Sequence, residues 1–239
     1  MSLLALENVS KRYRRGPREL VVLRNVSAKI EHGEVVVISG ARGSGRTTLL
    51  RIIAGAERPD DGRVLFADVD LAAATPAARR QIVLCNTRFL PAAGRDALDH
   101  VVMPQLAIGV SRDEAGLRAH RALERVGADR LAFTAPEAWI PSEALRVALA
   151  RAIVREPRVL LIDEPVNGVD LTERDPLLSI IQRVAHESGI TTLLTAGETT
   201  SVTGADRIMR LSDGELLGRA PRPGAPVVEL RRPASESSW

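Results

Sequence analysis

Cysteine, lysine and aromatic residues are all scarce in this chain of 239 residues. The single cysteine, Cys85, excludes an internal disulfide and is typical of a protein from a reducing compartment. It lies in the apolar run IVLC, so we expect a small buried side chain. No apolar run approaches the ~20 residues that a membrane-spanning helix needs. Charged residues interrupt the first apolar stretch, so we expect no N-terminal signal.

The charge balance is also mild. Lysine and arginine together number 33 against 30 acidic residues, and only Lys11 and Lys29 are lysines. A net charge of +3 without a dense basic cluster does not favour a nucleic-acid partner. Hydrophobic residues make up 45% of the chain, enough for one large domain or for a core with a small lobe.

The N-terminal part predicts strands. Residues 3–10 and 19–30 alternate and predict exposed antiparallel strands, whereas 34–39 is apolar on both faces, as in a central parallel strand. Residues 62–71 predict an edge hairpin, and 82–85 another inner strand.

Helical periodicity follows. Apolar residues recur at spacings of three and four between 96 and 139, which predicts a helical insert. A further helix is predicted over 142–154, with Ser142 as its cap. The runs VLLID, TTLLT and RIMRL predict strands, and 175–186 a helix. Residues 221–239, rich in Pro, Arg and Ser, predict a loose C-terminal tail.

A glycine-rich stretch, GARGSGRTT, follows the predicted strand at 34–39 and runs into a predicted helix at Thr47 to Ala54. Glycines let successive backbone N–H groups point at phosphate oxygens, and the helix N-terminus adds positive potential. The sequence therefore predicts a nucleotide-binding loop. Its residues are Gly40, Ala41, Arg42, Gly43, Ser44, Gly45, Arg46, Thr47 and Thr48.

An acidic pair ends the apolar run at 159–165, VLLIDEP. In such sites a hydroxyl and a carboxylate at the end of a strand hold the magnesium ion, and a second carboxylate polarises the attacking water. We expect Thr47 and Asp163 to hold Mg²⁺, and Glu164 to be the catalytic base. A glycine turn with a surface acidic pair would not explain the apolar residues that lead into Asp163.

Together with RVALARAIVREPRVLLIDEPVNGVD at 146–170, these motifs resemble the ATP-binding subunits of ABC transporters over residues 3–219. The resemblance implies an α/β fold, in which a P-loop NTPase core of ABC type carries an antiparallel β subdomain and a helical subdomain. It implies a nucleotide-binding domain over 1–220, with the helical subdomain at about 87–140. It also implies ATP and Mg²⁺ as cofactors. The branch that it looks most like serves lipoprotein export, macrolide export and cell division.

Two more residues take roles from the resemblance. Tyr13 lies where the family stacks an aromatic ring on adenine, although by itself it would be an ordinary half-buried strand residue. Asp170 lies at the aspartate of the family's D-loop, which contacts the second subunit of the dimer.

Several positions depart from the family pattern. Arg46 replaces the lysine of the phosphate loop, and its planar fork is not equivalent to an ammonium. The signature LSGGQ becomes WIPSE at 139–143, which is more simply a packing turn and helix cap. The family's glutamine falls near Asn86 or Thr87, and its histidine falls at Gly197. The four histidines present are expected to be solvated or loosely packed.

Three hypotheses remain open. The chain is an ATP-binding subunit with weak or absent hydrolysis, an active transport ATPase that works with a competent partner, or a nucleotide-free docking scaffold. In each case the resemblance implies a transmembrane permease subunit as partner and a peripheral location at the cytoplasmic face of the membrane. It also implies a homodimer or a heterodimer with a second nucleotide-binding subunit.

Overall fold

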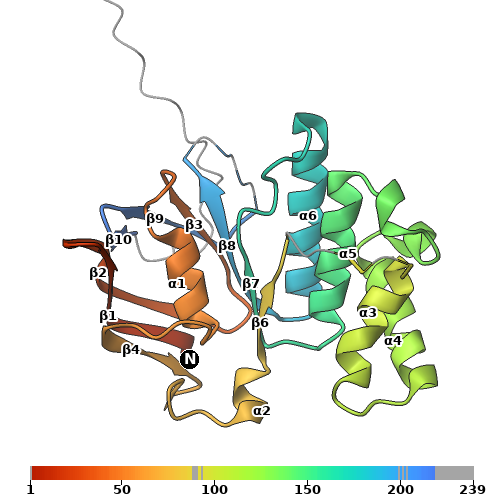
Figure 1. Cartoon of the computed structure of the whole chain (residues 1–239), viewed down its shortest axis with the longest axis horizontal. Helices are drawn as coiled ribbons and strands as arrows, with labels where there is room; N and C mark the ends of the chain where they lie inside the picture. Colours follow the sequence, from red (N-terminus) through yellow and green to blue (C-terminus); the bar gives the residue numbers. More distant parts are fainter. Residues whose placement is uncertain are drawn as a thin grey trace, which may run out of the picture.

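The computed structural model describes residues 2–87, 91–92, 94–198, 200, 202 and 204–218, and the predicted tail at 221–239 lies outside them. The described part is an α/β fold with two sheets (Figure 1). The strands are β1 (Ser2–Arg15), β2 (Arg18–Glu31), β3 (Val35–Gly40), β4 (Asp61–Phe66), β5 (Val69–Asp70), β6 (Ile82–Cys85), β7 (Val159–Ile162), β8 (Thr191–Gly197), β9 (Arg207–Ser212) and β10 (Glu215–Leu217). The helices are α1 (Arg46–Ile53), α2 (Pro76–Arg79), α3 (Ala97–Leu106), α4 (Arg112–Arg125), α5 (Pro141–Ile153) and α6 (Leu171–Glu187), with short 3-10 turns η1 (Asp129–Leu131) and η2 (Pro136–Ala138).

The larger sheet has the strand order β10-β9-β3-β8-β7-β6. All its neighbouring strands pair in parallel except β10, which pairs antiparallel with β9. The central position expected for residues 34–39 is confirmed, because β3 lies between β9 and β8. The inner position expected for 82–85 is wrong, because β6 is the edge strand. Helix α5 contacts β6, so this edge strand has the burial of an inner one.

Both faces of the inner part of the larger sheet, at β3, β7 and β8, are buried, and successive residues serve opposite faces. In β3, Val36 and Ile38 join a cluster with α1 and the smaller sheet, whereas Val35 and Val37 join a cluster with α5 and α6. The parallel strands therefore lie between two cores. This explains why β3, β6 and β7 are almost entirely apolar, and it leaves the C-terminal ends of the strands as the edge where polar groups gather.

The smaller sheet has the order β2-β1-β4-β5, and all its pairs are antiparallel. The antiparallel pairing expected for 3–10 and 19–30 and the edge hairpin expected at 62–71 are confirmed. The expectation that the first strand is exposed is wrong. Leu3, Leu4, Ala5 and Leu6 are all buried in β1. Leu3, Leu4 and Leu6 belong to the same hydrophobic cluster as the buried residues of α1.

Helices α3 and α4 pack on α5 beside the larger sheet (Figure 1). The expected cap Ser142 is wrong, because α5 begins at Pro141 and its N-cap is Ile140. The first helical position needs no hydrogen-bonded N–H, so a proline is tolerated there and the helix begins at Pro141, before the expected cap. Glu143 performs the capping, since its carboxylate accepts a hydrogen bond from the Ile140 N–H at 3.0 Å. Trp139 donates its indole N–H to the Thr134 carbonyl at 3.2 Å, so the segment is a packing turn and helix start.

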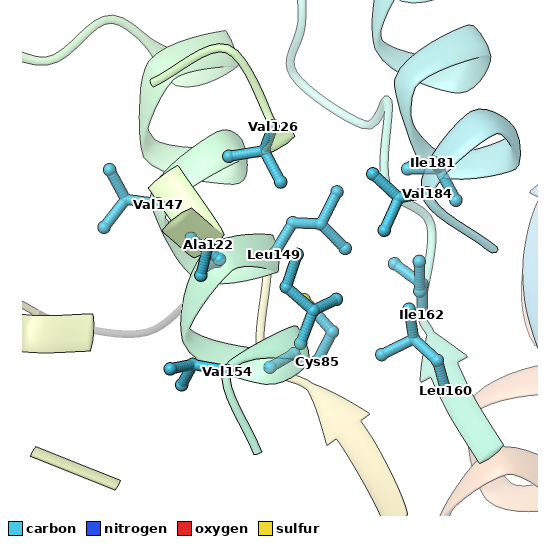
Figure 2. Close-up of a cluster of buried hydrophobic side chains, with 14 of the residues drawn as sticks. Cys85, Ala122, Val126, Val147, Leu149, Val154, Leu160, Ile162, Ile181 and Val184 are labelled. Carbon is cyan, nitrogen blue, oxygen red and sulfur yellow. The ribbon is translucent and has the colours of Figure 1, made fainter. Parts of the chain in front are cut away.

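Cys85 is buried in the core between β6, α5 and α6, as expected (Figure 2). Burial raises the pKa of its thiol to about 12. The thiolate is the reactive form, so the folded protein holds a far smaller reactive fraction at pH 8 than an exposed cysteine of ordinary pKa does.

Alkylation of Cys85 by a soluble thiol reagent at pH 8 is therefore expected to be at least ~100-fold slower in the folded chain than in denaturant. Mass spectrometry of timed reactions measures both rates. Similar rates in the two conditions would mean that β6 opens readily and that the buried position is wrong.

Candidate nucleotide-binding site

The phosphate loop joins the C-terminal end of β3 to the start of α1. Gly43 has a φ of 85° and Gly45 a φ of 101°, both in the left-handed region that favours glycine. Gly45 is also the N-cap of α1, so the first free N–H groups of the helix point into the loop. The structure thus forms the strand, loop and helix that the sequence predicted, with the geometry of an anion site.

Asp163 follows β7 and lies beside the loop. Thr47 donates its hydroxyl to one Asp163 carboxylate oxygen at 2.8 Å, and Thr195 donates to the other at 2.6 Å. The Thr47 and Asp163 oxygens are ligands that Mg²⁺ prefers. No cluster of three His, Cys, Asp or Glu side chains occurs among the described residues.

Thr195 was missed at the sequence level. It is fully buried in β8, and its hydroxyl also accepts a hydrogen bond from the Glu164 N–H at 2.8 Å. One side chain thus positions both members of the acidic pair. The available signal was a polar residue inside the otherwise apolar end of a predicted strand.

Arg46 is buried, with 6% of its surface exposed, and both arms of its guanidinium are bound. One arm donates to the Ala196 carbonyl, and the other to a Glu164 carboxylate oxygen at 2.6 Å. The second Glu164 oxygen accepts from the Asn167 side-chain amide at 3.1 Å. The residue expected to be the base is therefore held by a cation and an amide.

An open hollow of about 720 Å³ lies against this group. Three arginines line it, together with backbone of the phosphate loop and of the end of β8. The lining includes Arg42, Arg46 and Arg174, and the carboxylates of Glu164 and Glu198. Excess positive charge around exposed backbone N–H groups favours a polyphosphate over an uncharged ligand.

Tyr13 lies on β1 and is 36% exposed. Its hydroxyl donates to a Glu57 carboxylate oxygen at 2.5 Å, and the Lys11 ammonium lies 5.5 Å from its ring centre. Burial and the Glu57 contact raise the pKa of Tyr13, while the Thr48 hydroxyl of α1 acts in the opposite direction. The ring therefore lies next to the first turn of the helix that follows the phosphate loop.

Of the positions that depart from the family motifs, Arg46 and Gly197 line the same hollow. Gly197 ends β8, and the carboxylate of the next residue, Glu198, pairs with Arg210 at 2.6 Å. Thr87 donates its hydroxyl to the Asp163 carbonyl at 3.2 Å, and Asn86 is exposed. Asp170 is the N-cap of α6 and uses no side-chain cap bond.

The expectation that all four histidines are solvated or loosely packed is wrong for one of them. His32, His120 and His186 are exposed, but His100 is buried in α3 with its ring against Trp139. Burial lowers the pKa of His100. Asp99 precedes this histidine, but the buried Val101 and Val102 follow it, and that apolar neighbourhood was the signal for its position on the inner face of the helix.

These features define a P-loop nucleotide-binding fold, and the comparison with known proteins specifies the family. Residues 23–167 match the ABC transporter family. The chain therefore belongs to the ABC transporter family, as an ATP-binding domain.

Two relatives illustrate the match. The chain is 33% identical to the lipoprotein-releasing system ATP-binding protein LolD of Chromohalobacter salexigens, over 90% of this chain and 92% of LolD. It is also 33% identical to the macrolide export ATP-binding/permease protein MacB of Rhodopirellula baltica, over 98% of this chain but only 35% of MacB. The chain thus spans about a third of the MacB relative and nearly all of LolD.

Solved structures agree with the fold. The dimeric structure of MJ0796, a bacterial ABC transporter cassette, superposes with a TM-score of 0.79 at 26% identity, covering 89% of this chain and 96% of that one. A post-hydrolysis dimer of the same cassette, bound to ADP and Pi, gives 0.77. Within the residues that the structure describes, no helix has the length and apolar character to cross a membrane.

Proposed function

We propose that the chain binds Mg-ATP in the hollow beside the phosphate loop and hydrolyses it slowly or not at all. It would do so as the ATP-binding subunit of a membrane transport complex. The observation that carries this proposal is the ion pair between Arg46 and Glu164, 2.6 Å apart, with the arginine almost fully buried.

The ion pair affects both the contact of residue 46 with the phosphates and the ability of Glu164 to activate water. A lysine ammonium is a point charge that can follow the phosphates, whereas a guanidinium forms a planar fork that binds a carboxylate strongly. Here the fork joins Glu164 to the Ala196 carbonyl. Each Glu164 oxygen already accepts a hydrogen bond, from Arg46 or from Asn167, so an attacking water would have to share the carboxylate with these two donors.

Two other features support slow hydrolysis. Gly197 supplies no imidazole to the hollow, although it closes β8 beside Glu164. In the turn at 139–143 the Glu143 carboxylate caps α5, and Pro141 has no N–H to offer a phosphate. In a head-to-tail dimer this turn would face the nucleotide of the second subunit without the donors expected there.

Binding itself is supported by what remains. The loop glycines, the helix N-terminus and three lining arginines favour a polyphosphate, and Thr47 with Asp163 would hold Mg²⁺. The bound ion would neutralise phosphate charge. The protein's own contribution is to orient it, because Thr195 fixes the Asp163 carboxylate on its far side.

The partner proposal rests on the relatives. MacB combines an ATP-binding part and a permease in one chain, whereas LolD is an ATP-binding protein of nearly this length. We therefore expect a separate transmembrane permease subunit, with this chain bound peripherally at the cytoplasmic face as a homodimer or heterodimer. A further relative, the aliphatic sulfonates import protein SsuB 2 of Pseudomonas aeruginosa, is 35% identical, so the relatives include both import and export proteins.

Equilibrium titration of the purified chain with Mg-ATP up to millimolar concentration, followed by phosphate-release assays, tests the proposal. Saturable binding with phosphate release near background is the expected result. Rapid release that Glu164→Gln abolishes would instead establish an active ATPase. Absence of binding at millimolar Mg-ATP would contradict the proposal and support a docking scaffold.

A further inference from the structure

The Tyr13 ring is held by a charged cluster that no part of the phosphate chemistry uses. We propose that Lys11 and Glu57 are positioning residues that fix this ring for stacking on the nucleotide base. The inference rests on the proposed function, since it presumes that a nucleotide binds beside the loop. It assigns a role to two residues that the sequence motifs did not single out.

Glu57 fixes the outer end of the ring. The tyrosine hydroxyl donates to a Glu57 carboxylate oxygen at 2.5 Å, and a hydrogen bond to a charged acceptor is stronger than one between neutral groups. Glu57 lies just after α1, and Thr48 in the first turn of that helix also contacts the hydroxyl. The ring is therefore tied to the helix that carries the phosphate loop, and not only to its own strand.

Lys11 fixes the face of the ring. Its ammonium lies 5.5 Å from the ring centre and 3.6 Å from the Glu57 oxygen that the hydroxyl uses. It also donates to the Arg58 carbonyl at 2.8 Å and to Asp60 at 3.2 Å. Burial acts against the charged form of Lys11, but the Asp60 hydrogen bond and charge outweigh it, so the pKa of Lys11 is raised.

The use of lysine at this position is informative in a chain that has only two lysines among 33 basic residues. A compact ammonium can meet several acceptors in different directions while it covers a ring, whereas a planar guanidinium directs its donors within one plane. The geometry at Lys11 needs the first arrangement. This argues that the cluster has a specific task beyond supplying surface charge.

The cluster is rigidly mounted. Asp60 accepts a hydrogen bond from the Arg12 backbone N–H at 2.6 Å, and the Asp60 N–H donates to the Ser10 carbonyl at 2.9 Å. The Arg12 contact is the main reason why the pKa of Asp60 is lowered. The segment after α1 is thus bonded to β1 on both sides of Lys11. A ring held in this way loses less rotamer freedom when a base stacks on it.

Affinities for Mg-ATP and for magnesium tripolyphosphate, which has no base, test the assignment in the full chain. Glu57→Ala and Lys11→Met are each expected to weaken Mg-ATP binding roughly 3- to 10-fold and to leave tripolyphosphate binding unchanged. Glu57→Gln keeps an acceptor for the hydroxyl and should retain most of the Mg-ATP affinity. Glu7→Ala is the matched control, because it breaks an ion pair with Arg63 (2.7 Å) on the same sheet.

A double-mutant cycle adds a second readout. Tyr13→Phe keeps the ring but cannot donate to Glu57, so Tyr13→Phe and Glu57→Ala together should cost no more than either alone. Equal losses for Mg-ATP and tripolyphosphate would show a merely structural role and overturn the inference.

Two further outcomes separate this inference from the proposed function. Unchanged Mg-ATP affinity in Tyr13→Ala, or in both cluster variants, would overturn the positioning role and leave the proposed function intact. If the unaltered chain binds tripolyphosphate but not Mg-ATP, base stacking is absent and the inference fails. Failure to bind either ligand would overturn both proposals.

Discussion

The Arg46→Lys variant is expected to release phosphate from Mg-ATP at least ~10-fold faster than the unaltered chain. Lysine cannot bridge the Ala196 carbonyl and the Glu164 carboxylate with a rigid fork, so Glu164 regains an oxygen for the attacking water. The ammonium can also follow the phosphates. Single-turnover phosphate release at saturating Mg-ATP measures the change.

The effect should grow when the other departures are reversed. The backbone at 197 accepts a side chain, since a Cβ there would lie 3.5 Å from its nearest described neighbour, the Thr200 hydroxyl. Adding Gly197→His, and then LSGGQ at 139–143, should raise turnover further in steps. Each change restores a group that would contact the γ-phosphate, directly or across the dimer.

Two controls define what the result means. Glu164→Gln in the Arg46→Lys background should return phosphate release to background, because the gain is attributed to that carboxylate. Arg46→Met should keep hydrolysis low, since it removes the fork without supplying a charge. If the full set of restored residues leaves turnover unchanged while Mg-ATP still binds, the impairment lies outside these positions.

Gly45→Ala is expected to weaken Mg-ATP binding more than ~10-fold and to lower the melting temperature by several degrees. Gly45 has a φ of 101°, and a Cβ on it would lie 2.8 Å from the Val22 carbonyl oxygen of β2. Either the phosphate loop or β2 must move. A shift of the loop misdirects the N–H groups at the start of α1.

Gly43→Ala provides the matched control. Gly43 also has a positive φ, of 85°, but a Cβ there meets nothing within 4 Å. It carries the backbone strain of about 1 kcal/mol without the clash. Thermal unfolding should therefore show a clearly larger loss for Gly45→Ala than for Gly43→Ala. Equal losses would mean that backbone strain alone, and not contact with β2, makes glycine necessary at position 45.

Local patterns were enough to predict the parallel strands and the loop. Every residue of β3 and β7 is buried and nearly all are apolar, because both faces are covered, and the glycine-rich stretch begins at the end of β3. The edge position of β6 was not predictable, because α5 covers that strand as a neighbouring strand would. The start of α5 was misjudged at Ser142, since the capping carboxylate of Glu143 comes from inside the helix.

The sequence by itself determined the family, the nucleotide loop and the acidic pair, because these depend on residue type at short, regular spacing. It also showed that Arg46 and Gly197 depart from the family pattern. Only the tertiary structure decided what those departures do. The contact between Arg46 and Glu164 joins residues 118 positions apart, and Thr195 joins the acidic pair from another strand. Pairings of this kind depend on the order of strands in the sheet, which no local pattern encodes.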